Sequence, residues 1–126
     1  MTRNDFIRRV EESKPFTAAD GATVYELFNP SRSAIKNLSL ASGFLETGKD
    51  ARAHFHKKSE EIYYVLSGQG QIRLGEKKFS ISRGDAIFVP VNTAHALANT
   101  SQTESLTVLA IESPPYQDND LFFINE

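Results

Sequence analysis

The chain has 126 residues, of which 40% are hydrophobic and nine are Phe, so it has enough apolar material for one packed domain and no room for a second. Its 14 Lys and Arg residues are nearly balanced by 16 Asp and Glu and form no basic block, which argues against a nucleic-acid partner. The lack of cysteine excludes disulfides, thiolate catalysis and Cys-ligated zinc, and favours a cytoplasmic protein. No stretch approaches the roughly 20 apolar residues that span a bilayer, so we expect no membrane contact.

The first element predicted is a short helix over residues 4–13. Phe6, Ile7 and Val10 would share one of its faces, and Pro15 would end it. A helix of about ten residues is not stable alone in water, so we expect it to dock on the body of the protein or on a partner chain.

From residue 22 onward the pattern predicts β-strands. Short apolar runs recur at 24–28, 38–40, 43–45, 62–66, 71–74, 78–81, 86–89, 95–98 and 106–111, with turn residues between them. The run 74–77, with Gly75 first in the turn, suits a tight hairpin, and further turns are expected at 83–85 and 90–93. Many short strands at even spacing are typical of a β-sandwich or a β-barrel. The apolar residues 121–124 should pack on it.

The three histidines carry the chemistry of the sequence. His54 and His56 are two residues apart, so on a strand their rings point to the same side. Glu61 opens the next strand and shares a face with Tyr63, and His95 follows the turn at 90–93. Imidazoles with one carboxylate suit Fe, Mn, Co, Ni or Zn, although each of these residues alone could also be an ordinary solvated or hydrogen-bonded side chain.

The spacing of these residues resembles the two motifs of the cupin family. The first motif reads Gly48, five residues, His54-Phe55-His56, four residues, Glu61, six residues, Gly68. The second reads Gly84, five residues, Pro90-Val91-Asn92, two residues, His95, three residues, Asn99. Asn92 stands where the family usually has Gly, and Asn tolerates the left-handed backbone that such a turn requires.

The resemblance implies an all-β fold, the double-stranded β-helix or jelly-roll barrel, with a short N-terminal helix or arm. Residues 1–126 would form one cupin domain, with the barrel over about 38–112, the arm over 1–37 and the tail over 113–126. It also implies one divalent transition metal ion (Fe, Mn, Ni, Co or Zn), held by His54, His56, Glu61 and His95.

Two further residues are candidates for catalysis. Tyr63 lies two residues beyond Glu61 on the same face and would reach a metal-bound ligand, or it belongs to the core. Arg73 would hold an acidic ligand if its strand presented it inward, and is solvated if Ile72 and Leu74 point inward instead. Phe44, Phe88 and Leu97 are candidate cavity walls or core, and Tyr116 would cap the barrel mouth or fix the tail.

The resemblance leaves several functions open. A metal-dependent enzyme acting on a small organic molecule is expected. A dioxygenase-type reaction is favoured because no second acidic residue or lysine sits obviously in the motifs to serve as a base, and isomerase, lyase and decarboxylase reactions are possible. The alternative is a non-catalytic barrel that binds a small molecule or a sugar. Small cupins usually form homodimers, in which N-terminal strands cover the sheet edges of the partner.

Overall fold

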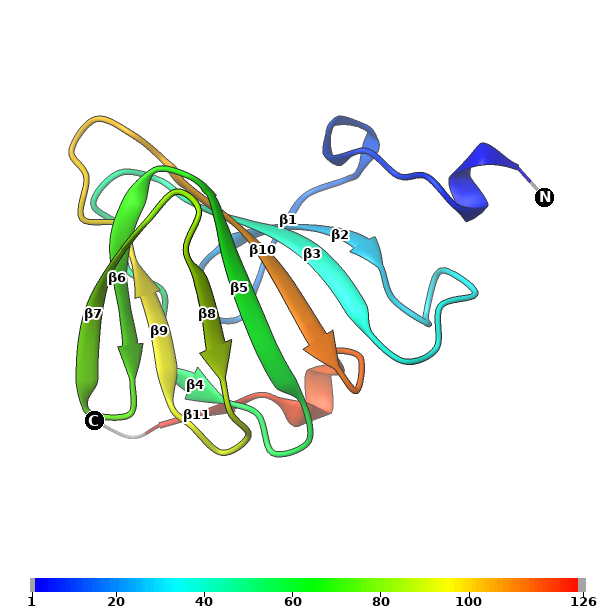
Figure 1. The fold of residues 1–126 in the computed structure, drawn as a ribbon. Helices are drawn as coiled ribbons and strands as arrows, with labels where there is room; N and C mark the ends of the chain where they lie inside the picture. Colours follow the sequence, from blue (N-terminus) through cyan, green and yellow to red (C-terminus); the bar gives the residue numbers. More distant parts are fainter. Residues whose placement is uncertain (1, 125–126) are drawn as a thin grey trace.

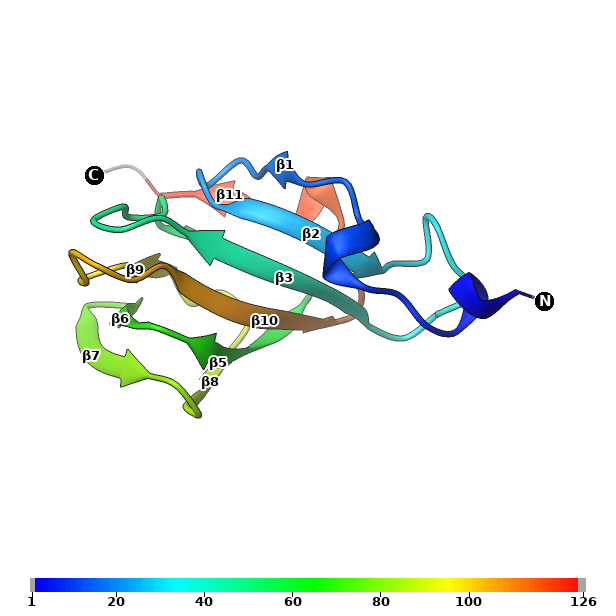
Figure 2. The same ribbon diagram turned by 90° about the horizontal axis from the view of Figure 1, so that it is seen from above.

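The computed structural model describes residues 2–124 as two antiparallel sheets that pack face to face (Figures 1 and 2). The first sheet, sheet A, has the order β1 (Phe16–Thr17), β2 (Thr23–Phe28), β3 (Ser39–Leu45), β10 (Leu106–Ser113), β5 (Glu60–Ser67), β8 (Ala86–Val89). The second, sheet B, has the order β11 (Phe122–Phe123), β4 (His54–Phe55), β9 (His95–Ala98), β6 (Gln69–Leu74), β7 (Lys77–Ser82). The predicted all-β jelly roll is confirmed.

Strand β5 shows how the sequence sorts its side chains between the cavity and the outside. Its residues alternate strictly, with Glu61, Tyr63 and Val65 buried and their neighbours exposed. This is the two-residue period of a half-buried strand, and the predicted parity of β5 is confirmed. The neighbouring strand β8 alternates as well, but Ile87 and Val89 are its buried residues.

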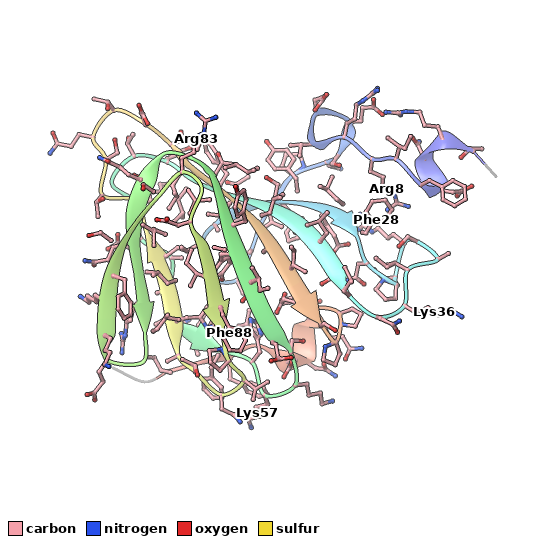
Figure 3. The ribbon with its side chains drawn as sticks, in the orientation of Figure 1. Arg8, Phe28, Lys36, Lys57, Arg83 and Phe88 are labelled. Atoms are coloured by element: carbon pink, nitrogen blue, oxygen red, sulfur yellow. The ribbon has the colours of Figure 1, made fainter. Side chains whose placement is uncertain are left out.

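The alternation of β8 corrects one expectation. Phe88 is 55% exposed on the outer face of sheet A, as Figure 3 also shows, so its prediction as a cavity wall or core residue is wrong. Its partner across the sheet, Ile62, is likewise exposed. The large apolar side chain of Phe88 suggested burial, but its position in the alternation of the strand places it on the exposed face.

The predicted helix over residues 4–13 is also wrong. The segment contains two single 3-10 turns, η1 (Arg3–Asp5) and η2 (Val10–Glu12), and projects beyond the sheets. Phe6 and Ile7 are 64% and 54% exposed, so among residues 2–124 the apolar face that a helix would need for docking stays largely uncovered.

Arg8 holds this N-terminal arm onto strand β2. Its guanidinium donates hydrogen bonds to the carbonyl oxygens of Leu27 at 2.9 Å and of Arg32 at 2.8 Å. It also lies over the Phe28 ring, 4.8 Å from the ring centroid (Figure 3).

The described residues include no helix long and apolar enough to cross a membrane.

Two turns have the backbone that the sequence predicts. Gly75 and Glu76 alone connect β6 to β7, and Gly75 has a φ of 61°. Asn92, at the position where glycine is usual, has a φ of 60°. The Asn92 N–H donates to the carbonyl oxygen of His56 at 2.7 Å, so this turn also fixes the end of the histidine-bearing strand.

The core fills one half of the barrel and leaves the other half polar. Val65, Ile72 and Leu106 are at most 1% exposed and pack between the sheets. Glu61 lies at the opposite end of β5 from Val65, and Glu112 at the opposite end of β10 from Leu106. The fold therefore gathers polar side chains at the end of the barrel where β4 and β11 lie (Figure 1).

Candidate metal centre

The three histidine rings are all fixed in the same way. The Nδ1 atom of His54 contacts the Arg52 carbonyl oxygen at 3.0 Å, that of His95 the Thr93 carbonyl oxygen at 2.9 Å, and that of His56 the Asp120 carbonyl oxygen at 2.7 Å. A carbonyl oxygen only accepts, so each Nδ1 carries the proton and donates. Each Nε2 is then the atom left to bind something else, an arrangement characteristic of metal-ligating histidines.

Two of the Nε2 atoms, those of His56 and His95, lie beside the Glu61 carboxylate inside the barrel. His54 and His95 face each other on the paired strands β4 and β9, and ligand atoms of all three histidines lie within 4.8 Å of one another. Glu61 Oε1 is 3.1 Å from His95 Nε2 and 3.4 Å from His56 Nε2. The structure thus brings together the four residues that the sequence singled out, and all four are buried.

Several atoms of this cluster lack the partners that burial demands. Among residues 2–124, three buried side-chain atoms have no hydrogen-bond partner: Glu61 Oε1, His95 Nε2 and Glu112 Oε1. Leaving such an atom unsatisfied costs about 1–3 kcal/mol. All three lie in one cluster of nitrogen and carboxylate donors, and such donors suit a divalent cation, so the residues fit the metal that the motifs imply.

Glu112, on β10, is a site residue that the sequence analysis missed. It pairs with Glu61 of β5 in the sheet register, and its Oε1 lies 3.2 Å from His56 Nε2. His56, Glu61 and Glu112 form a second group able to hold a cation. The alternation of buried Leu106 and Val108 along β10 carries a signal for Glu112, because every second residue of that strand faces inward.

Asp120 is the second residue that the sequence analysis missed. It lies in η3 (Asp118–Asp120), and its carboxylate accepts hydrogen bonds from the backbone N–H groups of Lys57 at 2.9 Å, Lys58 at 3.1 Å and Ser59 at 3.1 Å. Its own carbonyl oxygen accepts the His56 Nδ1 proton. We call residues 118–123 the C-terminal strap; it fixes both the loop after His56 and the His56 ring.

The charges in the cluster are strongly coupled. Burial opposes ionisation of Glu61, but the adjacent His56 and His95 imidazoles outweigh it and lower the pKa of Glu61 to about 2. Burial likewise disfavours protonated His56, but the adjacent Glu61 and Glu112 carboxylates raise its pKa to about 9. Burial and the nearby His95 lower the pKa of His54. Burial first, and then the Glu61 charge, raise the pKa of Glu112 to about 8.

The two candidate catalytic residues lie in different places. Tyr63 is buried beside Glu61, and burial, followed by the Glu61 charge, raises the pKa of its hydroxyl well above the ordinary value. Arg73 is not among the residues that line the cavity; Ile72 points into the core beside it, and the Arg73 Nε donates to the Gly75 carbonyl oxygen at 2.9 Å. The structure therefore brings Tyr63 but not Arg73 to the cluster.

A cavity of about 380 Å³ opens beside the cluster, between the two sheets. Phe44 and Leu97, for which the sequence left cavity wall and core open, line it together with Leu45 and Val108. Tyr116 also lines the cavity, and the centroid of its ring lies 6.2 Å from that of His56. One end of the cavity is thus formed by metal-type donors and the walls are largely apolar, which is the usual make-up of a small-molecule site.

Comparison with known proteins agrees with this geometry. The chain is 34% identical over 110 residues to an uncharacterized protein of Methanocaldococcus jannaschii, and the aligned region covers 87% of each chain. Its fold resembles the polyketide cyclase RemF of Streptomyces resistomycificus (TM-score 0.79, 18% identity, 95% of this chain and 85% of that chain). It also resembles the Streptomyces nucleoside dehydratase Pac13, solved with uridine (TM-score 0.76, 22% identity, 95% and 91% covered).

A third solved structure is a predicted oxalate decarboxylase of Thermotoga maritima (TM-score 0.76, 25% identity, 86% of this chain and 98% of that chain). The model of the cupin domain matches residues 44–112, which contain both histidine motifs and end at Glu112. The chain belongs to the cupin family.

Proposed function

We propose that this cupin is a metal-dependent enzyme that acts on a small organic molecule, with His54, His56, Glu61 and His95 holding one divalent transition metal ion (Fe, Mn, Ni, Co or Zn). The observation that carries the proposal is the cluster of three buried imidazoles, each anchored through Nδ1 to a carbonyl oxygen, with the Nε2 atoms of His56 and His95 within 3.4 Å of the Glu61 carboxylate. When bound, such an ion supplies Lewis-acid activation of a substrate oxygen or, for iron, a site for O2.

Glu112 supports proton transfer as part of the reaction. No acidic residue of the motifs besides Glu61 was an obvious base, and this favoured a dioxygenase-type reaction. Glu112 supplies a second buried carboxyl group from outside the motifs. With a pKa of about 8, its carboxyl is protonated at neutral pH and can donate a proton to a leaving oxygen or carbon in the cavity. Tyr63, buried beside Glu61, is placed to orient a ligand by its hydroxyl. A lyase, isomerase or decarboxylase reaction gains support from this pair.

The experiment that tests the reaction type compares turnover with and without O2. Metal-loaded protein is incubated with panels of small alcohols, sugars and keto acids, and products are followed by mass spectrometry. Product formation without O2 that is lost in Glu112→Gln, at unchanged metal content, supports proton transfer. Turnover that requires O2 and does not depend on Glu112 contradicts the proposed proton transfer and favours the dioxygenase-type reaction.

The alternative function is a non-catalytic barrel that binds a small molecule or a sugar. Its support is the mostly apolar wall of the cavity around Phe44, Leu45 and Val108. Ligands that bind the metal-loaded protein but leave it chemically unchanged across the same panels would favour this alternative.

A homodimer is part of the proposal. Ile62, Tyr64, Leu66 and Phe88 are each at least 40% exposed on the outer face of β5 and β8, and monomeric proteins rarely present so large a continuous apolar patch. A second copy of the chain would cover it. Light scattering after size exclusion should give twice the 14.0 kDa chain mass, and a Phe88→Lys variant should give a single chain. A monomeric parent protein contradicts this part of the proposal.

A further inference from the structure

Acidic side chains dominate the lining of the cavity. Five carboxylates line it, contributed by Asp20, Glu26, Glu61, Glu112 and Asp118. Among the described residues that line the cavity there is no Lys or Arg. The uneven distribution is specific to this place, because the whole chain is nearly neutral, with 14 basic and 16 acidic residues.

The basic residues nearest the donor end of the barrel are held elsewhere. The Arg52 guanidinium lies over the Phe123 ring, 3.8 Å from its centroid, and the Lys57 ammonium lies over the Phe122 ring at 4.2 Å. Both residues are exposed, and neither lines the cavity. Figure 3 shows Lys57 at the outer edge of the barrel. Cation–π contacts with the C-terminal strap therefore keep these charges away from a bound ligand.

Some carboxylate oxygens of the lining have no partner within the protein. Glu61 Oε1 and Glu112 Oε1 are buried without a hydrogen-bond partner. Asp20 uses Oδ1 to accept the Ala22 N–H, and its Oδ2 is 3.9 Å from His54 Nδ1. Asp118 accepts the Tyr116 hydroxyl. Even with the Glu112 carboxyl protonated, a divalent ion at the histidines would offset only two of the four remaining negative charges, so the field in the rest of the cavity stays negative.

We propose that the cavity selects small molecules that donate hydrogen bonds and carry no acidic group, such as alcohols, polyols, nucleosides and amines, and rejects phosphates and carboxylates. An ionised carboxylate only accepts hydrogen bonds, so it pairs with ligand O–H and N–H groups and repels a second anion. The apolar walls formed by Phe44, Leu45 and Val108 take the carbon face of such a ligand. The inference rests on the proposed function, because it takes the cavity beside the histidines as the binding site.

Three probes of equal size test the selection: benzylamine, benzyl alcohol and benzoate. Their dissociation constants are measured by NMR titration on the zinc-loaded protein and on the metal-free protein. We expect benzylamine and benzyl alcohol to bind at least about tenfold more tightly than benzoate in both forms, from like-charge repulsion at short range. Benzoate that binds as tightly as benzyl alcohol overturns the inference. Failure of all three to bind also overturns it, because the cavity would then not accept a ring of this size.

A matched pair of variants identifies the charges as the cause. Glu26→Gln with Asp118→Asn removes two carboxylates from the cavity lining, and Glu76→Gln with Glu104→Gln removes two from the exposed surface outside it. Benzoate affinity should rise at least about fivefold in the first double variant and stay unchanged in the second. An equal response in both contradicts the inference. Zinc uptake is measured separately, as the metal content of the protein. Protein that takes up no zinc counts against the proposed function, and the titrations of the metal-free protein still test whether the cavity rejects anions.

Discussion

Strand β5 carries Val65 into one half of the barrel and Glu61 into the other, and the two side chains are almost equally inaccessible to solvent, at 0% and 4% exposed. Around Val65 lie Ile72, Ile81 and Leu106, which form the apolar half. Around Glu61 lie the three histidines and Glu112, which form the donor half. Burial in the apolar half stabilises the fold by removing hydrocarbon from water. In the donor half the same degree of burial leaves polar atoms without partners, which costs stability until a cation binds.

The largest expected effect comes from opening a hole in the apolar half. Ile72→Ala should lower the free energy of unfolding by about 2–5 kcal/mol, since Ile72 is 1% exposed and its removal leaves a cavity. Ile7→Ala, on the arm at 54% exposed, is the matched control and should change it by less than about 0.5 kcal/mol. Chemical denaturation measures both. Equal losses would mean that burial in the apolar half is not what makes Ile72 stabilising.

The pH dependence of stability should separate the halves next. The folded-state pKa values of His56, about 9, and Glu112, about 8, lie above their ordinary values of 6.5 and 4.5. Both groups bind their protons more tightly in the folded state, so their contribution is complete below the ordinary pKa and is lost as the pH rises through the folded pKa. Glu61, with its pKa lowered to about 2, contributes above pH 4.5 and loses that contribution only as the pH falls toward 2.

The melting temperature of metal-free protein should therefore fall by several degrees between pH 6 and pH 9. Zinc-saturated protein should show a smaller fall or a rise, because metal binding displaces these protons. Glu112→Gln should flatten the curve of the metal-free protein. A melting temperature that rises over this range in the metal-free protein contradicts the charge arrangement of the donor half.

The C-terminal strap should affect the donor half selectively. Asp120→Ala removes three backbone hydrogen bonds from the loop after His56 and loosens the carbonyl that anchors its Nδ1. Zinc affinity should fall about 10–100-fold, as is usual for groups that orient a metal ligand. The control variant Asn119→Ala, at the exposed neighbouring residue, should leave the zinc affinity unchanged. A variant that melts earlier but binds zinc as before would limit Asp120 to a structural role.

The smallest effect is expected at the turn of the second motif. Asn92→Ala should cost about 1 kcal/mol of stability, because alanine at a φ of 60° meets its carbonyl oxygen, whereas Asn92→Gly should change stability by less than about 0.5 kcal/mol. Equal stabilities of the two variants, measured by denaturant titration, would show that the left-handed backbone is not what Asn92 provides.

The sequence was sufficient where one motif or one period determines the structure. The alternation along β5 predicted which side chains face inward, and motif spacing brought His54, His56, Glu61 and His95 to one place. It was not sufficient where a contact depends on register between distant strands. Glu112 reaches Glu61 only because β10 pairs with β5 at that offset.

Asp120 and the arm mark the same limit. Asp120 meets residues 57–59 through the path of the tail, which no local pattern encodes. The arm has an apolar spacing that suits a helix, but its Phe6 and Ile7 side chains stay exposed in the described part of the chain, and so the spacing alone predicted the wrong structure.

The measurement that tests the central claim most directly is the metal content of protein purified without a metal-affinity tag, determined by elemental analysis beside a His56→Ala control. The account predicts about one equivalent of iron, manganese, nickel, cobalt or zinc in the parent protein and its loss in the control. Parent protein that holds no metal, and takes none up from a defined mixture of these ions, would contradict the assignment of the donor half as a metal centre.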